Sequence, residues 1–226
     1  MNLPGQLTRD EWKSVVLSKV DPDYTALLVV DLQNDFCSAE GALASLGSDV
    51  SPCAAAAQKI EEFLLKVRGK VSFVAFFQLV YDPGKMSESQ RERLIRDGKP
   101  IICTPGTKGS ELFVQPVATD FVFVKHHYSA FSNKQFQELL RERSIRTLVV
   151  TGVDTHICVE GTVREGYDLG YRMLVLSDLV ATRSSELSRH ENSLAMCERY
   201  FALTLESNKF LALLKTQGQA ARKANT

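Results

Sequence analysis

The chain has 226 residues, 44% hydrophobic and 24% charged, which is enough for one sizeable α/β domain with a well-buried core. Its 27 basic and 27 acidic side chains give a formal net charge of zero, which argues against nucleic acid or a membrane surface as a partner, because both usually attract a basic face. No apolar run approaches the ~20 residues that span a bilayer, and residues 1–16 lack the pattern of a signal peptide, so we expect a cytoplasmic protein.

Six short β-rich runs are almost continuously apolar rather than alternating. In chain order they cover residues 25–31, 70–78, 120–125, 146–152, 172–178 and 199–204. This pattern is typical of strands that are buried on both faces of a parallel sheet.

Helical patterns separate most of these runs. One helix is predicted to begin at Ser51-Pro52 and to end at Gly69. Others are predicted over residues 133–145, which carry an apolar stripe, and over residues 184–200, where a serine can cap the first turn. The alternation predicts a doubly wound α/β fold: a six-stranded, mainly parallel sheet flanked by helices.

The whole chain, residues 1–226, is predicted to form one domain. Residues 1–23 are an N-terminal extension, and the low-complexity tail 217–226 is expected to be disordered. Residues 82–119 interrupt the alternation with a charged helix and a loop. Such an insertion often forms either a lid over a site or an oligomer contact, and the sequence leaves both open.

Three strand ends of the predicted sheet carry chemically reactive side chains. The first run ends at Asp31, the third ends at Lys125, and the fourth is followed by Cys158, where the next helix should begin. Doubly wound sheets place their sites at the carboxyl ends of strands, so we expect these three side chains to lie together.

A cysteine at a helix start is suited to nucleophilic chemistry. Unpaired N–H groups there and an ammonium such as that of Lys125 stabilise a thiolate, so we expect the pKa of Cys158 to lie below the ~8.5 of a free thiol. A carboxylate such as Asp31 could take the thiol proton and return it to a leaving amine. Each residue also has an ordinary interpretation: a buried cysteine packs as a small apolar group, a strand-end aspartate caps a turn, and a strand-end lysine is a solvated charge.

Three stretches resemble the isochorismatase-like cysteine hydrolases in order and spacing: LLVVDLQNDFC (27–37), KHHYSAF (125–131) and VVTGVDTHICVEGTVREGYDLGY (149–171). That superfamily includes nicotinamidases, isochorismatases, and hydrolases of N-carbamoylsarcosine, ureidoacrylate and biuret. The resemblance covers about residues 24–205 and implies a parallel six-stranded sheet.

The resemblance also implies the parts of an active site. Asp31, Lys125 and Cys158 would form the catalytic triad. A cis peptide bond would join Val153 to Asp154, and the backbone amides of Asp154 and Cys158 would form an oxyanion hole. The family usually forms dimers or tetramers, so a homo-oligomer is expected.

The implied reaction is hydrolysis of a C–N bond through a thioester on Cys158, with release of ammonia or an amine and with no cofactor. Two alternatives stay open: vinyl-ether hydrolysis, as in isochorismatases that lack the cysteine, or an inactive member of the family that acts as a binding protein. The presence of Cys158 favours C–N hydrolysis.

The branch of the family is indicated by the segment after the second strand. It reads FFQLVYDPGK (76–85), and no histidine precedes residue 125, so the metal-binding motif of nicotinamidases is missing and no metal is expected. Together with GALASLGSDVS (41–51), this segment resembles the ureidoacrylate and biuret hydrolase branch. The expected substrate is a small ureido or carbamoyl compound.

Five residues are candidates for substrate contacts: Gln78, Tyr81, Tyr128, Phe131 and His156. Gln78 could equally be a structural amide, and the three aromatic residues could be plain core or interface. His156 could line the pocket or cap the loop before the cysteine.

Overall fold

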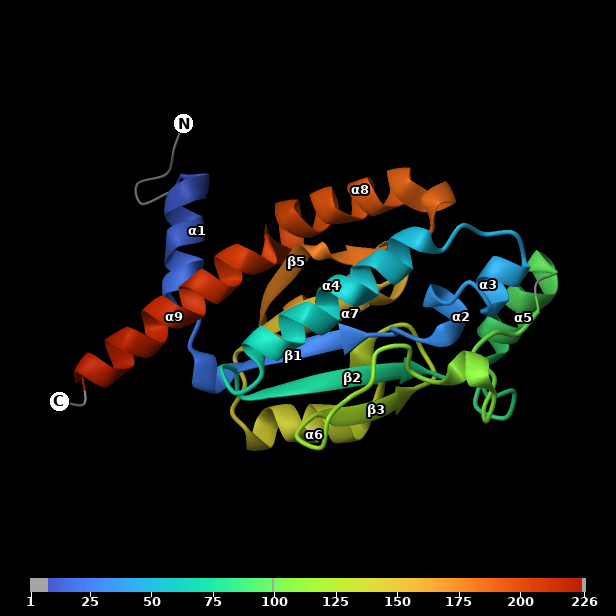
Figure 1. Ribbon diagram of the computed structural model, residues 1–226, viewed down its shortest axis with the longest axis horizontal. Coiled ribbons are helices and arrows are strands. Elements are labelled where there is room, and N and C mark those ends of the chain that lie inside the picture. Colours follow the sequence, from blue (N-terminus) through green and yellow to red (C-terminus); the bar gives the residue numbers. More distant parts are fainter. Residues whose placement is uncertain (1–7, 99, 225–226) are drawn as a thin grey trace.

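A parallel sheet of six strands runs through the centre of the molecule, with helices packed on both of its faces (Figure 1). The computed structural model describes residues 8–98 and 100–224. The strands are β1 (Thr25–Val30), β2 (Phe73–Leu79), β3 (Phe121–Lys125), β4 (Thr147–Val153), β5 (Arg172–Ala181) and β6 (Ala202–Leu205). All six predicted strands are present, and the predicted doubly wound α/β fold is confirmed.

Helices alternate with the strands along most of the chain. They are α1 (Arg9–Ser18), α2 (Asn34–Cys37), α3 (Ala42–Ser45), α4 (Ser51–Val67), α5 (Glu88–Asp97), α6 (Lys134–Glu142), α7 (Glu160–Asp168), α8 (Leu187–Met196) and α9 (Ser207–Ala224). In the described part of the chain, none of them combines the length and the apolarity that crossing a bilayer needs.

The two faces of the sheet are covered by different helices. On one face α4 packs against β4, β5 and α9. On the other, Phe136 of α6 contacts Phe77 and Phe123, with ring centroids 4.8 and 5.6 Å apart, and Gly166 of α7 lies against Met173. Strands covered on both sides need apolar residues at successive positions, which explains their continuous apolar runs.

The strand order places the topological switch at β1. The order is β3-β2-β1-β4-β5-β6, so the chain winds outward from β1 to β3 and then returns to form β4 on the other side of β1. The connections that leave β1 and β4 therefore diverge and open a crevice at the carboxyl ends of these strands.

Two segments differ from the prediction. β6 begins at Ala202 rather than at residue 199, because a π-helical turn, η6 (Cys197–Phe201), continues α8. Residues 217–224, which low complexity predicts to be disordered, form the end of α9, because alanine, glutamine, arginine and lysine are strong helix formers. Residues 225–226 of the predicted tail and residues 1–7 of the extension lie outside the described residues.

Gly152 lies where β4 pairs with β1, and its environment predicts a large effect of substitution. Its φ is +114°, and a Cβ here would overlap the backbone of Val30. We expect Gly152→Ala to lower the free energy of unfolding by roughly 3 kcal/mol or more, because strain at positive φ adds to overpacking. Gly170→Ala is the control, since its φ is also positive at +88° but a Cβ at this position would meet no atom within 4 Å. Urea denaturation that gives equal losses would contradict the steric argument.

Candidate active site

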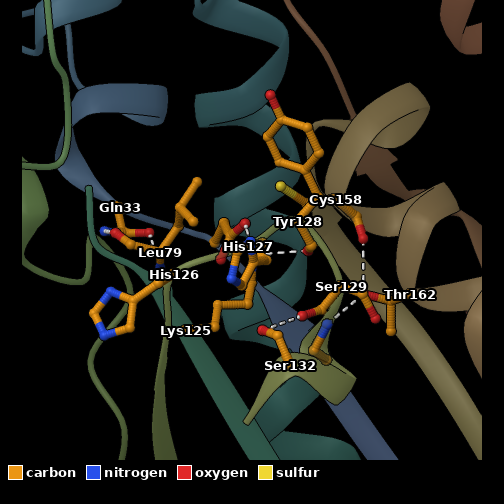
Figure 2. A network of polar contacts seen from close by, with 12 residues as sticks. Gln33, Leu79, Lys125, His126, His127, Tyr128, Ser129, Ser132, Cys158 and Thr162 are labelled. Atoms are coloured by element: carbon orange, nitrogen blue, oxygen red, sulfur yellow. Dashed lines mark hydrogen bonds and ion pairs between the residues drawn. The ribbon is translucent and has the colours of Figure 1, made fainter. Parts of the chain in front are cut away.

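Lys125, at the end of β3, is completely buried and held by three acceptors. Its Nζ donates to Asp31 Oδ2 at 2.8 Å and to the carbonyl oxygens of His127 at 3.1 Å and Tyr128 at 2.8 Å; Figure 2 shows the lysine and its two carbonyl partners. The side chains of Lys125 and Asp31 are both 0% exposed. A buried ion pair is tolerated only when further hydrogen bonds satisfy it, and the chain just after β3 supplies them.

Cys158 lies in a π-helical turn, η4 (Thr155–Val159), that leads directly into α7. The Thr162 hydroxyl donates to the Cys158 carbonyl at 2.7 Å and accepts the N–H of Ala130 at 3.0 Å (Figure 2). Thr162 therefore ties the cysteine turn to the loop that follows β3. The thiol also lies close enough to Asp31 for each group to shift the pKa of the other.

The connection from β4 to this turn contains a cis peptide bond between Val153 and Asp154, at the position that the resemblance implies. The Asp154 carbonyl accepts the N–H groups of Ile157 at 3.1 Å and Val159 at 3.3 Å. The chain therefore turns directly from the strand end into the helix that carries Cys158.

The pKa of Cys158 differs from the expectation. Burial raises the pKa of Cys158 well above its ordinary value, and the negative charge of Asp31 adds to this, while Lys125 opposes it. The predicted low pKa is therefore wrong, because complete burial outweighs the helix-start N–H groups and because the lysine is engaged by Asp31. In the free protein the thiol is protonated.

The pKa values of Asp31 and Lys125 are both raised above their ordinary values. Burial raises the pKa of Asp31, although the charge of Lys125 and the Cys158 thiol oppose the change. Burial alone lowers the pKa of Lys125, but the charges of Asp31 and Cys158 outweigh it, so the net direction is upward. A carboxylate with a raised pKa is a stronger base, which suits it to accept a proton from the thiol beside it.

These shifts predict how Cys158 reacts with thiol reagents. Because the charge of Asp31 raises the pKa of Cys158, we expect Asp31→Asn to speed iodoacetamide alkylation of Cys158 by about tenfold near neutral pH. Alkylation would be followed by peptide mass spectrometry, with buried Cys53 as the internal control. Slower alkylation in Asp31→Asn would mean that Asp31 promotes the thiolate in the free protein.

A pocket of about 120 Å³ opens onto Cys158. Its wall is mostly apolar and includes Phe36, Leu43, Leu46, Leu79, Ile102 and Ile157. Its polar groups are Tyr81, Tyr128, Arg93, Asp154 and Arg183. The pocket therefore joins the Cys158 thiol to a largely apolar surface.

Helix α5, within the segment 82–119, supplies part of this wall. Arg93 and Leu94 line the pocket, and the Arg93 guanidinium lies 5.9 Å from the ring centroid of Tyr128. Gln90 donates to the His126 carbonyl at 2.9 Å, which fastens the helix to the loop after β3. This placement favours a lid over an oligomer contact as the role of segment 82–119. Both roles stay predictions.

The candidates for substrate contacts separate into two groups. Tyr81 and Tyr128 line the pocket. Phe131 does not, because it packs in the core against Phe136 and Tyr171. Gln78 is a structural amide whose Nε2 donates to the Ser110 carbonyl.

His156 also lies outside the pocket wall. It is half-buried in η4, and its Nδ1 has no partner among the described residues. Burial lowers its pKa. The structure thus gives it no contact with the pocket that Cys158 faces.

Gln33 and Arg183 are the residues that sequence reasoning missed. Gln33 is buried just after β1 and joins three segments: its Nε2 donates to the carbonyls of Leu79 and Ser110, both at 2.8 Å, and its Oε1 accepts the Leu79 N–H at 2.8 Å. Arg183 follows β5 and reaches the pocket. The signal for both is their position just after the first and fifth strand ends, the same signal that points to Asp31.

Comparisons with known proteins show which family and which solved structures the chain resembles. A family model described as the isochorismatase domain matches residues 25–209. Ureidoacrylate amidohydrolase RutB of Pseudomonas syringae pv. syringae is 30% identical, over 89% of this chain and 88% of its own. The crystal structure of a cysteine hydrolase from Pseudomonas syringae pv. phaseolicola has a TM-score of 0.77 at 23% identity, covering 88% of this chain and 95% of that chain. An N-carbamoylsarcosine amidase from Thermoplasma acidophilum has a TM-score of 0.64 at 26% identity, covering 81% and 96%.

Proposed function

Because the chain belongs to the isochorismatase family, we propose that it is a cysteine amidohydrolase that cleaves a C–N bond of a small amide or ureido compound. The observation that carries the proposal is the buried Asp31–Lys125 pair beside the Cys158 thiol, where the pocket opens. The names of two relatives, a ureidoacrylate amidohydrolase and an N-carbamoylsarcosine amidase, support the same reaction class.

In the first half of the reaction, Asp31 takes the proton of the Cys158 thiol as the sulfur attacks the substrate carbonyl. The thiol is protonated at rest because burial and Asp31 raise its pKa, so the thiolate forms only as the C–S bond forms. The ammonium of Lys125 keeps Asp31 ionised and in position. The backbone amides of Asp154 and Cys158 hold the tetrahedral oxyanion.

The first half ends when protonated Asp31 gives its proton to the leaving nitrogen, the C–N bond breaks, and ammonia or an amine departs. The acyl or carbamoyl group is left as a thioester on Cys158. In the second half, Asp31, now a carboxylate again, takes a proton from water as the water oxygen attacks the thioester, and it gives that proton to the Cys158 sulfur as the C–S bond breaks. In each half of the reaction Asp31 takes up one proton and gives one back, so a single carboxylate serves both halves.

The test is ammonia release by the purified protein from a panel of ureidoacrylate, biuret, N-carbamoylsarcosine, other N-carbamoyl amino acids and nicotinamide. Release from a ureido or carbamoyl compound is the expected result. Hydrolysis of a vinyl ether, with no amide hydrolysed, would contradict the proposal and favour the vinyl-ether alternative. No ammonia from any compound of the panel, with the protein folded, would contradict it and favour the binding-protein alternative. Association into dimers or tetramers and a cytoplasmic location stay predictions, which sedimentation and cell fractionation would test.

A further inference from the structure

A second pocket, of about 610 Å³, lies at the end of the sheet opposite Cys158. Tyr24 and Arg146 directly precede β1 and β4, Arg172 is the first residue of β5, and all three line this pocket. Helices α1 and α9 lie at this end of the sheet, whereas α2, α3 and α5 lie at the other end (Figure 1). The chain reaches Cys158 only after the seven residues of β4, which span roughly 20 Å. The two pockets are therefore separate sites.

Three positive side chains line the second pocket: Lys19, Arg146 and Arg172. Among the described residues, no carboxylate forms an ion pair with any of them. The acidic residue of the lining is Asp21, whose Oδ1 accepts the N–H of Asp23 at 3.0 Å and so caps its own turn. Although the formal net charge of the chain is zero, this pocket has a local excess of positive charge.

Both guanidinium groups are held in place by their neighbours. Arg172 Nη1 donates to the Lys19 carbonyl at 3.0 Å and to Thr147 Oγ1 at 2.9 Å. The Arg146 guanidinium lies over the ring of Tyr24, 4.5 Å from its centroid. A planar fork that is already oriented loses less conformational freedom when it binds a ligand. These two arginines are therefore preorganised at the pocket wall.

The two guanidinium groups also act on each other. The pKa of Arg172 is lowered, first by burial and then by the charge of Arg146. The fold thus keeps two like charges close together, and among the described residues it supplies no counter-ion. An anion bound between them would replace this repulsion with attraction.

A phosphate group fits this arrangement better than other ligand groups. Guanidinium forks match the oxygens of phosphate, and a phosphate ester carries close to two negative charges at neutral pH, where a carboxylate carries one. The volume of the pocket lies within the range of small-molecule sites. A nucleic acid would need an extended basic face, which a chain of zero net charge does not favour.

We propose that Lys19, Arg146 and Arg172 form a binding site for the phosphate group of a small organic phosphate, at the opposite end of the sheet from the candidate active site. The site does not depend on the proposed hydrolysis, so its test needs no turnover.

The test is calorimetry on the full chain in a phosphate-free buffer. The probes are glycerol 3-phosphate, inorganic phosphate, and glycerol as the matched ligand without a phosphate. We expect glycerol 3-phosphate to bind with a dissociation constant of about 1 mM or below, and glycerol not to bind. Equal binding of glycerol, or no binding of glycerol 3-phosphate at about 10 mM, would overturn the proposal. Inorganic phosphate that binds while glycerol 3-phosphate does not would also overturn it, because the site would then take only the free ion.

A matched pair of variants assigns the binding to this pocket. Arg146→Gln removes one charge, and the Arg146 side chain donates no hydrogen bond to a described residue, so the fold should be kept. We expect it to weaken glycerol 3-phosphate binding by about tenfold or more. Arg199→Gln is the control, because Arg199 also lies over a tyrosine ring, 5.8 Å from the centroid of Tyr200, but does not line the pocket. Binding within about twofold of the unaltered protein is expected there. Equal losses in both variants would mean unspecific attraction and would overturn the proposal.

A third variant separates this pocket from the one beside Cys158. Arg93 lines only the latter of the two pockets. We expect Arg93→Gln to leave the affinity for glycerol 3-phosphate unchanged. Loss of binding in Arg93→Gln, with binding kept in Arg146→Gln, would place the phosphate in the candidate active site and overturn the proposal. Ammonia release from a ureido compound tests the reaction independently of either result.

Discussion

Replacing Cys158 by alanine is expected to lower turnover of the accepted amide roughly 10⁴-fold or more, because the nucleophile itself is removed. The folded state should change little. The thiol is buried and free, and alanine loses only the sulfur, which costs about 1 kcal/mol in a core position. Steady-state ammonia release and urea denaturation of the same preparation measure the two effects.

Cys197→Ala is the matched control for this variant. Cys197 is also a buried, free cysteine in a π-helical turn, η6, but it does not line the pocket. We expect Cys197→Ala to lose a similar free energy of unfolding and to keep turnover within about twofold of the unaltered protein. Turnover that survives Cys158→Ala would remove the thioester from the mechanism, and equal losses in both variants would point to folding rather than chemistry.

The sheet was predictable because its strands are buried on both faces. Such strands must be apolar at consecutive positions, and every residue of β1 is buried. The segments around the sheet were harder to predict. Helix α1 is polar, so apolar periodicity does not predict it, although Thr8 and Glu11 form a capping box that marks its start. At the end of α9 the low complexity of the sequence predicts disorder, but the helix propensity of the same residues prevails.

The candidate triad was predictable for a similar reason. Topology alone brings the ends of β1 and β3 and the turn after β4 to one edge of the sheet. Asp31, Lys125 and Cys158 therefore lie at the same edge, whatever their side-chain types. The electrostatics were not predictable, because the pKa of Cys158 depends on its burial and on the pairing of Lys125 with Asp31. Helix α5 reaches the pocket through loops, whose course no periodicity records.

Replacing Lys125 by methionine is expected to be the most damaging change for stability. The methionine fills the same space but leaves the Asp31 carboxylate buried without its ammonium, and breaking one half of a buried ion pair costs about 3–5 kcal/mol. Turnover should also fall, because Asp31 without Lys125 holds its proton more tightly and can no longer accept one from Cys158. Lys108→Met is the control: Lys108 and Glu40 form an exposed pair at 3.0 Å, whose loss should cost about 0–1 kcal/mol.

The pH dependence of this loss separates an electrostatic cause from a packing defect. Burial already raises the folded-state pKa of Asp31 above its unfolded value, and the loss of Lys125 raises it further. Such a group contributes stability that is present below the unfolded pKa and is lost as the pH rises through the folded pKa. The deficit of Lys125→Met relative to the unaltered protein should therefore be small near pH 4, close to the unfolded pKa of an aspartate, and should grow as the pH rises from there.

A double substitution removes both charges of the buried pair. Asp31→Asn in the Lys125→Met background removes the buried charge, so it should recover about 2–3 kcal/mol of the free energy of unfolding and flatten its pH dependence. Turnover should stay lost, since the base is gone. If the double variant is no more stable than Lys125→Met, the damage comes from packing, and the Asp31–Lys125 pair has no special electrostatic role. Recovery of stability without recovery of turnover would show that the pair is retained for chemistry, because an uncharged pair suffices for the fold.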